Sequence, residues 1–180
     1  KLQATRIQRY FMDNYQYGMG FPRQILFLRA QAEKRFLDAF DLREDLTRQI
    51  GGALQGNRDL LGLYVVFNAN ALDGKDEIFA NQPEVGSNES GRFSVYWSQG
   101  TPGQTESEVM TEESLADITP GISGLPYNSW FTCPLQTEQT CVIDPYFDEV
   151  NGKDVLMATI AIPLIDNGKV IGVMGMDFSL

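Results

Sequence analysis

Carboxylates and aromatic side chains recur between Tyr127 and Asp177. Tyr146 and Asp148 are two positions apart in an extended segment, so their side chains point to the same side of a strand. An aromatic ring beside a carboxylate can bind an ammonium group through cation–π attraction and a charge-assisted hydrogen bond. The spacing therefore indicates a candidate cage for a small cation. It is also compatible with Tyr146 in the core and Asp148 in a turn.

A further carboxylate, Asp177, lies in the last predicted strand. It shares one face of that strand with apolar and small residues: Ile171, Val173, Gly175 and Ser179. A buried and unpaired charge is very costly, so Asp177 either turns toward water or pairs with a cation. Trp130 and Phe131, judged singly, are more typical of a core than of a cage.

The chain contains no histidine, which excludes Ser-His-Asp and Cys-His catalysis and nearly all zinc enzymes. A hydrolase that uses two carboxylates is the remaining enzyme hypothesis, but no pair of acids stands out for it. We expect a protein that is not an enzyme and that uses no cofactor. Asp73-Gly74-Lys75-Asp76 lacks the alternating oxygen ligands of a calcium loop, so we expect a surface turn and no metal site there.

Cys133 and Cys141 are the only cysteines and stand eight positions apart. A disulfide that closes this short loop is their natural use, and it indicates an oxidising compartment such as the periplasm. Two unpaired thiols are the alternative.

The net charge is −10 and the isoelectric point is about 4.4. An acidic surface argues against nucleic acid and anionic lipid as partners and suits cationic ligands, although it also serves solubility alone. The 180 residues begin at Lys1 without a leader and hold no apolar run of the ~18–20 residues that cross a bilayer. We therefore expect a soluble piece of a larger protein.

The elements that must position these residues are helical first and strand-rich afterwards. Apolar residues at three- and four-residue spacing predict one long amphipathic helix over 24–54, which begins near Pro22 and ends at Gly51-Gly52. Residues 1–20 are also expected to be helical. We expect an α+β fold with a long helical segment over 1–57 and a ligand-binding module over 58–180.

Strands are expected over 61–67, 92–97, 155–165 and 170–179. Asn167-Gly168 between the last two predicts a tight antiparallel hairpin. Residues 98–127 are rich in Gly, Pro, Ser, Thr and Glu and predict a long excursion that covers a pocket, with one short helix over 112–116.

The order and spacing of the short motifs resemble a Cache domain, in particular the membrane-distal module of the double Cache sensor of bacterial methyl-accepting chemotaxis proteins. The resemblance covers about residues 58–180 and rests on Leu63-Tyr64-Val65-Val66-Phe67, Asp73-Gly74-Lys75-Asp76, Gly91-Arg92-Phe93, Tyr96-Trp97, Trp130-Phe131, Asp144-Pro145-Tyr146, Gly152-Lys153-Asp154-Val155-Leu156-Met157 and Gly172-Val173-x-Gly175-x-Asp177. It implies a PAS-like antiparallel sheet, a long N-terminal helix, periplasmic exposure and a pocket for a small molecule.

The resemblance also implies site residues. In relatives that sense amino acids, a basic residue two positions before the Trp-aromatic pair holds the ligand carboxylate, and a later Tyr with two Asp residues holds the amino group. Here Asn128 stands where the basic residue should be, and Phe131 replaces a commoner Tyr. The expected ligand contacts are therefore the weaker candidate Tyr96 together with Asn128, Trp130, Phe131, Tyr146, Asp148 and Asp177.

We therefore expect the periplasmic sensor domain of a chemoreceptor in the inner membrane, with a polyamine or biogenic amine as ligand. Asp148 and Asp177 would pair with ammonium, Tyr146 and Trp130 would wall it, and Asn128 would hydrogen-bond its far end. The alternatives are an α-amino acid whose carboxylate is held by Arg92, or the same domain in a histidine kinase or diguanylate cyclase. A homodimer through the N-terminal helix is expected in the full-length receptor.

Overall fold

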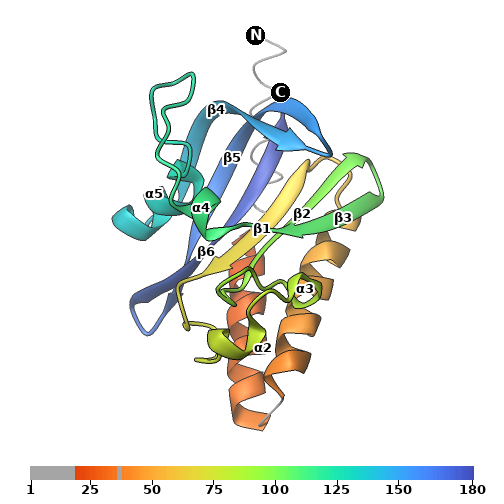
Figure 1. The fold of residues 1–180 in the computed structure, drawn as a ribbon, viewed down its shortest axis with the longest axis vertical. Helices are drawn as coiled ribbons and strands as arrows, with labels where there is room; N and C mark the ends of the chain where they lie inside the picture. Colours follow the sequence, from red (N-terminus) through yellow and green to blue (C-terminus); the bar gives the residue numbers. More distant parts are fainter. Residues whose placement is uncertain (1–18, 36–37) are drawn as a thin grey trace.

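The structure, a computed structural model, describes residues 19–35 and 38–180. Six antiparallel strands form one sheet in the order β3-β2-β1-β6-β5-β4. Two helices, α2 and α3, pack on one face, and α4 and α5 cover part of the other (Figure 1). The strands are β1 (Gly62–Phe67), β2 (Ser94–Thr101), β3 (Gln104–Val109), β4 (Cys141–Val150), β5 (Lys153–Asp166) and β6 (Lys169–Ser179). The helices are α2 (Phe21–Arg35), α3 (Ala39–Gln55), α4 (Glu112–Leu115) and α5 (Ser129–Thr137), with the short 3-10 helices η1 (Asp76–Phe79) and η2 (Pro83–Val85).

The prediction of one continuous helix over 24–54 is wrong. The chain forms two helices, α2 and α3, which lie side by side (Figure 1). Asp38 ends the periodic pattern, because its carboxylate accepts a hydrogen bond from the backbone N–H of Phe40 at 2.9 Å and so caps the start of α3. Phe40, part of the predicted apolar stripe, is accordingly 40% exposed. Nearly all of the predicted helix over 1–20 lies outside the described residues.

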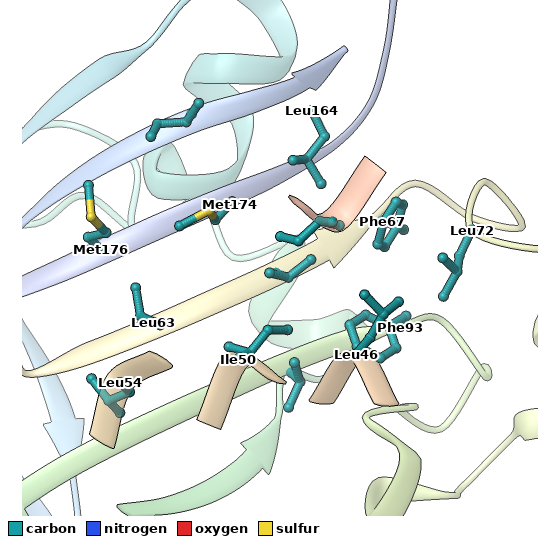
Figure 2. Packing of buried hydrophobic residues seen from close by; sticks show 14 of the residues in the cluster. Leu46, Ile50, Leu54, Leu63, Phe67, Leu72, Phe93, Leu164, Met174 and Met176 are labelled. Carbon is teal, nitrogen blue, oxygen red and sulfur yellow. The ribbon is translucent and has the colours of Figure 1, made fainter. Parts of the chain in front are cut away.

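The larger core lies between the sheet and the two long helices. Leu46, Ile50 and Leu54 of α3 follow one another along one side of the helix and are almost fully buried. They face Leu63 and Phe67 of β1, with Met174 and Met176 of β6 beside them (Figure 2). Each large apolar side chain that is buried in this way stabilises the folded state by roughly 1.5–3 kcal/mol. The helical segment and the sheet thus share one core.

A buried arginine, which the sequence did not reveal, joins α3 to the segment after β1. Arg43 is fully buried and pairs with Asp73 at 2.8 Å and with Asp76 at 2.7 Å. Its guanidinium also lies 4.2 Å from the centre of the Phe79 ring. Asp73-Gly74-Lys75-Asp76 was expected to be a surface turn. Its two carboxylates instead balance a buried charge.

The prediction of a hairpin at Asn167-Gly168 is confirmed. Asn167 and Gly168 have φ of 50° and 75° and connect β5 to β6, as the tight turns of hairpins require. Asn151 and Gly152 repeat this geometry between β4 and β5, with φ of 52° and 76°.

The expected excursion over 98–127 is shorter than predicted. β2 continues to Thr101, and residues 104–109 return beside it as the edge strand β3. This strand is polar and largely exposed, so it carries no alternation of apolar residues that sequence reasoning could detect. The short helix expected over 112–116 is present as α4 (Glu112–Leu115).

Candidate functional site

A cavity of about 200 Å³ lies between the sheet and the segment that carries α4 and α5. Its wall on the sheet side consists of Tyr64, Tyr96 and Tyr146. Glu108, Val109, Met110, Thr111, Ser114, Tyr127, Trp130, Asp148 and Glu149 complete the lining. Four other hollows, of about 370 to 390 Å³, are larger. The smaller cavity is the candidate site because, among these five, phenols, an indole and carboxylates converge only there.

Two glycines make room for the tyrosines of the wall. A Cβ on Gly175 of β6 would lie 2.0 Å from the ring of Tyr64, and one on Gly62 of β1 would lie 2.5 Å from the hydroxyl of Tyr96. Such distances are far inside van der Waals contact. Tyr64 can therefore cross β6 and donate a hydrogen bond to the backbone oxygen of Trp130 at 2.6 Å. This bond fixes α5 above the sheet.

Asp177 lies behind the wall and is only 2% exposed. The Thr159 hydroxyl donates to its Oδ1 at 2.5 Å, and the hydroxyls of Thr159 and Tyr146 are 2.7 Å apart. Burial raises the pKa of Asp177 to about 7, although the hydrogen bond from Thr159 opposes the rise. The Tyr96 hydroxyl also lowers the pKa of Asp177 through their interaction, but no hydrogen bond of proper geometry joins them. Among the described residues, the Tyr96 hydroxyl is thus buried without a hydrogen-bond partner.

Carboxylates gather at the mouth of the cavity. The Tyr127 hydroxyl donates to Asp148 at 2.9 Å, and burial raises the pKa of Asp148. Burial also raises the pKa of Glu108, and the negative charges of Asp148 and Glu149 add to this rise. The mouth therefore repels anions, and a cation there would relieve the repulsion.

Three of the four phenols that line this site have protein acceptors for their protons, whereas the Tyr96 hydroxyl and the indole N–H of Trp130 have no partner among the described residues. Tyr64 donates to the Trp130 backbone oxygen and Tyr127 donates to Asp148. While Asp177 is ionised, Thr159 donates to it, so the Thr159 oxygen receives the proton of Tyr146. Burial raises the pKa of Tyr64 and of Tyr146, which keeps both phenols neutral. The hydroxyls of Tyr64, Tyr127 and Tyr146 can therefore offer a ligand only their oxygen lone pairs.

Four of the predicted site residues line the cavity together, namely Tyr96, Trp130, Tyr146 and Asp148. The hydrogen bonds of Asp177 reach the wall through Thr159, and the Tyr96 hydroxyl of the wall also acts on its pKa. Phe131 is buried in the core around the cavity but is not part of the lining. Asn128 is not part of the lining either. Its side-chain amide donates to the backbone oxygen of Leu115 at 2.8 Å and so ties the start of α5 to α4.

Sequence reasoning missed several residues of the site. Glu108 belongs to β3, which was expected to be loop, and Thr159 is one polar residue inside an apolar strand. Tyr64 and Tyr127 stood within or next to recognised motifs, yet their sequence context gave no reason to separate them from core residues. The signal for Tyr64 was Gly175, because a glycine inside a strand often marks a close approach of another group.

No basic side chain among the described residues lines the cavity. Arg92, the alternative clamp for a carboxylate, forms a salt bridge with Glu112 at 2.9 Å and is not part of the lining. The described residues also hold no group of three or more His, Cys, Asp or Glu that could bind a metal ion.

A disulfide joins Cys133 of α5 to Cys141 at the start of β4, as predicted. The same two elements supply Trp130 on one side of the cavity and Tyr146 with Asp148 on the other. The disulfide thus connects opposite walls of the site.

Residues 46–180 match the family of the methyl-accepting chemotaxis protein-like, first PDC sensor domain. The chain belongs to this family. It is also 65% identical over all 180 residues to the methyl-accepting chemotaxis protein TlpQ of Pseudomonas aeruginosa. Both findings confirm the resemblance to a chemoreceptor sensor domain.

Solved sensor domains share the fold of this PDC domain. The extracellular domain of the putative histidine kinase mmHK1S-Z3 matches 94% of the chain with a TM-score of 0.68 and 24% identity. The periplasmic sensory domain of the Campylobacter jejuni chemoreceptor Tlp1 matches 98% with a TM-score of 0.62 and 15% identity. The ligand-binding domain of C. jejuni Tlp3, solved with L-valine, matches 99% with a TM-score of 0.58 and 16% identity. At such identities these similarities establish the fold alone.

The chain spans 25% of the length of TlpQ and 53% and 56% of the mmHK1S-Z3 and Tlp1 chains. No helix among the described residues is both long and apolar enough to span a bilayer.

Proposed function

We propose that this PDC domain is the periplasmic ligand-binding domain of a chemoreceptor and that its cavity binds a small cationic amine, such as a polyamine or biogenic amine. One observation carries the proposal: the cavity offers carboxylates and phenolic lone pairs, and no Lys or Arg of residues 19–35 and 38–180 lines it. An ammonium group has several donors and no acceptor, so it complements such a lining. The rings of Tyr146 and Trp130 add cation–π attraction.

An α-amino acid fits this lining less well. Its ammonium group would be bound in the same way, but its carboxylate would meet Glu108, Asp148 or Glu149 and no basic side chain. Like charges at close range are strongly unfavourable in a partly buried site. Tlp3, which was solved with L-valine, shares the fold of this chain at only 16% identity, so its ligand does not carry over.

The membrane setting belongs to the same proposal. The disulfide suits the oxidising periplasm. The family and the similarity to TlpQ favour a chemotaxis receptor of the inner membrane over a histidine kinase or diguanylate cyclase. Dimerisation through the N-terminal helix is part of the proposed receptor. We further propose a role in binding and signalling, not in catalysis.

Thermal-shift and calorimetric binding measurements with amines, amino acids and organic acids test the proposed ligand class. We expect amines to stabilise the domain and carboxylates without an amine to have no effect. Asp148→Asn should weaken amine binding by roughly 10- to 100-fold, because an ammonium group loses a charged hydrogen-bond partner. Asp41→Asn is the matched control, since Asp41 is exposed on α3 at the opposite face of the sheet. Stabilisation by carboxylates and not by amines would refute the proposed ligand class.

A further inference from the structure

One hydroxyl connects the buried acid to the cavity wall. Thr159 of β5 is fully buried, with 0% exposure. Its Oγ1 lies 2.5 Å from Oδ1 of Asp177 and 2.7 Å from the hydroxyl oxygen of Tyr146. Asp177 is not part of the cavity lining, whereas Tyr146 is. Thr159 is therefore the hydrogen-bonded connection between the acid and the surface that a ligand touches.

The direction of this connection depends on one proton. When Asp177 is ionised it can only accept, so Thr159 donates to it and Tyr146 must donate to Thr159. The Tyr146 oxygen then offers lone pairs to the cavity. When Asp177 carries a proton it can donate to Thr159, and the bond between Thr159 and Tyr146 can reverse, since either hydroxyl can be its donor. The Tyr146 proton is then free to point at the cavity. There it would face the N–H donors of an ammonium group, and two donors cannot form a hydrogen bond.

The surroundings of Asp177 favour this proton. The titratable groups that face it are Tyr64 on β1, Tyr96 on β2, Tyr146 and Asp148 on β4, and Tyr127 before α5. The four phenols are neutral because burial raises the pKa of each. Asp148 is the other acid in this group, and its negative charge opposes ionisation of Asp177.

We propose that Thr159 is a positioning residue through which protons and amines compete: loss of the Asp177 proton turns the Tyr146 oxygen into an acceptor and admits the ammonium group. This inference rests on the proposed function and adds that pH controls amine binding at the same site. The balance is one proton released from the Asp177–Thr159–Tyr146 relay for each ammonium group bound beside Tyr146. Amine binding then strengthens as the pH rises through the titration of Asp177 and levels off above it.

Two variants separate the relay from mere packing. Thr159→Val keeps the shape of the side chain and removes the hydroxyl, whereas Thr159→Ser keeps the hydroxyl. Because the hydrogen bond from Thr159 lowers the pKa of Asp177, its loss raises that pKa. Loss of one charge-assisted hydrogen bond should raise the pKa of Asp177 by about one to two units. If Thr159→Val does not fold, Thr159→Ala removes the same hydroxyl.

The first measurement needs no ligand. Carboxyl ¹³C NMR of the domain, with the Asp177 signal assigned by Asp177→Asn, follows its titration. We expect the wild-type and Thr159→Ser domains to titrate near pH 7 and Thr159→Val to titrate about one to two units higher. The same titration in all three proteins overturns the proposal, whether or not an amine binds.

The second measurement is calorimetry with 1,4-diaminobutane from pH 5.5 to 8.5, in buffers of different ionisation enthalpy. Alkyl ammonium groups titrate near pH 10, so the ligand stays charged over this range. We expect affinity to rise by up to about tenfold per pH unit below pH 7, proton release on binding, and roughly tenfold weaker binding at pH 7.5 in Thr159→Val alone. Tight binding whose affinity and pH dependence are unchanged in Thr159→Val overturns the relay, whether or not protons are released, and leaves the amine proposal standing. No binding of any amine by the wild-type domain refutes the proposed function, and the relay is then judged by NMR.

Discussion

The buried carboxyl group of Asp177 should make the stability of the empty domain depend on pH. Asp177 is 2% exposed, and its pKa is about 7 where an unfolded Asp titrates near 4. A raised acid pKa means that the folded state binds more protons than the unfolded state between about pH 4 and 7, so stability falls as the pH rises through that window. Ionisation of Asp177 above pH 7 costs up to about 4 kcal/mol of folding free energy.

Asp177→Asn removes this cost because the amide stays neutral. We expect the variant to be more stable than wild type at pH 8 and nearly equal to it at pH 4, with urea unfolding at both values as the measurement. An amide oxygen can still accept from Thr159, so local packing is preserved. Equal or lower stability of the variant at pH 8 would show that Asp177 is not held as a buried acid.

At the scale of elements, the shape of the cavity depends on how closely the Tyr64 side chain of β1 crosses Gly175 of β6. Gly175→Ala would place a methyl group 2.0 Å from the Tyr64 ring, which holds the Trp130 backbone oxygen and with it α5. We expect a loss of about 1–3 kcal/mol of stability, typical of overpacking, together with weaker amine binding. Urea unfolding and calorimetry measure the two effects.

Gly52→Ala is the matched control for that substitution. Gly52 lies inside α3, and a Cβ there meets nothing within 4 Å. Alanine is the better helix former, so this variant should gain roughly 0.5–1 kcal/mol. A stability loss of the same size in both variants would contradict the steric account of Gly175.

The elements also show what the sequence could predict. β1, β2, β5 and β6 carry apolar or β-branched patterns, and the Asn-Gly turn specified the β5–β6 hairpin, so these features were predicted correctly. β3 was missed because an exposed edge strand needs no apolar face. The break between α2 and α3 was missed because one capping residue, Asp38, outweighed a continuous apolar stripe.

The site was predictable to the extent that side-chain spacing along one strand reveals it. Tyr146 and Asp148, two positions apart, do line the cavity together. Asn128 was placed at the ligand by its sequence position, but the start of α5 turns its amide toward Leu115. Thr159 joins Tyr146 and Asp177 across three strands, and such contacts depend on strand register, which sequence spacing alone does not give.

At the scale of the molecule, the sheet separates the cavity from the long helices and also connects them. Tyr64 of β1 faces the cavity, whereas its neighbours Leu63 and Val65 belong to the core under α2 and α3. A ligand that displaces the β1 backbone at Tyr64 would therefore also act on the core under α3. In the proposed receptor, ligand binding would shift the balance between two arrangements of these helices.

The disulfide between Cys133 and Cys141 joins α5 to β4, an edge strand of the sheet. It closes a short loop between α5 and β4, and breaking such a loop costs about 2–3 kcal/mol through the entropy of the unfolded chain. The Cys133→Ser/Cys141→Ser double variant should lose that stability in urea unfolding. It should also bind 1,4-diaminobutane more weakly, because α5 and β4 supply opposite walls of the cavity. Wild-type domain under reducing conditions is the control and should behave like the double variant. Unchanged affinity together with lower stability would limit the disulfide to a role in folding and leave the position of Trp130 to its hydrogen bond from Tyr64.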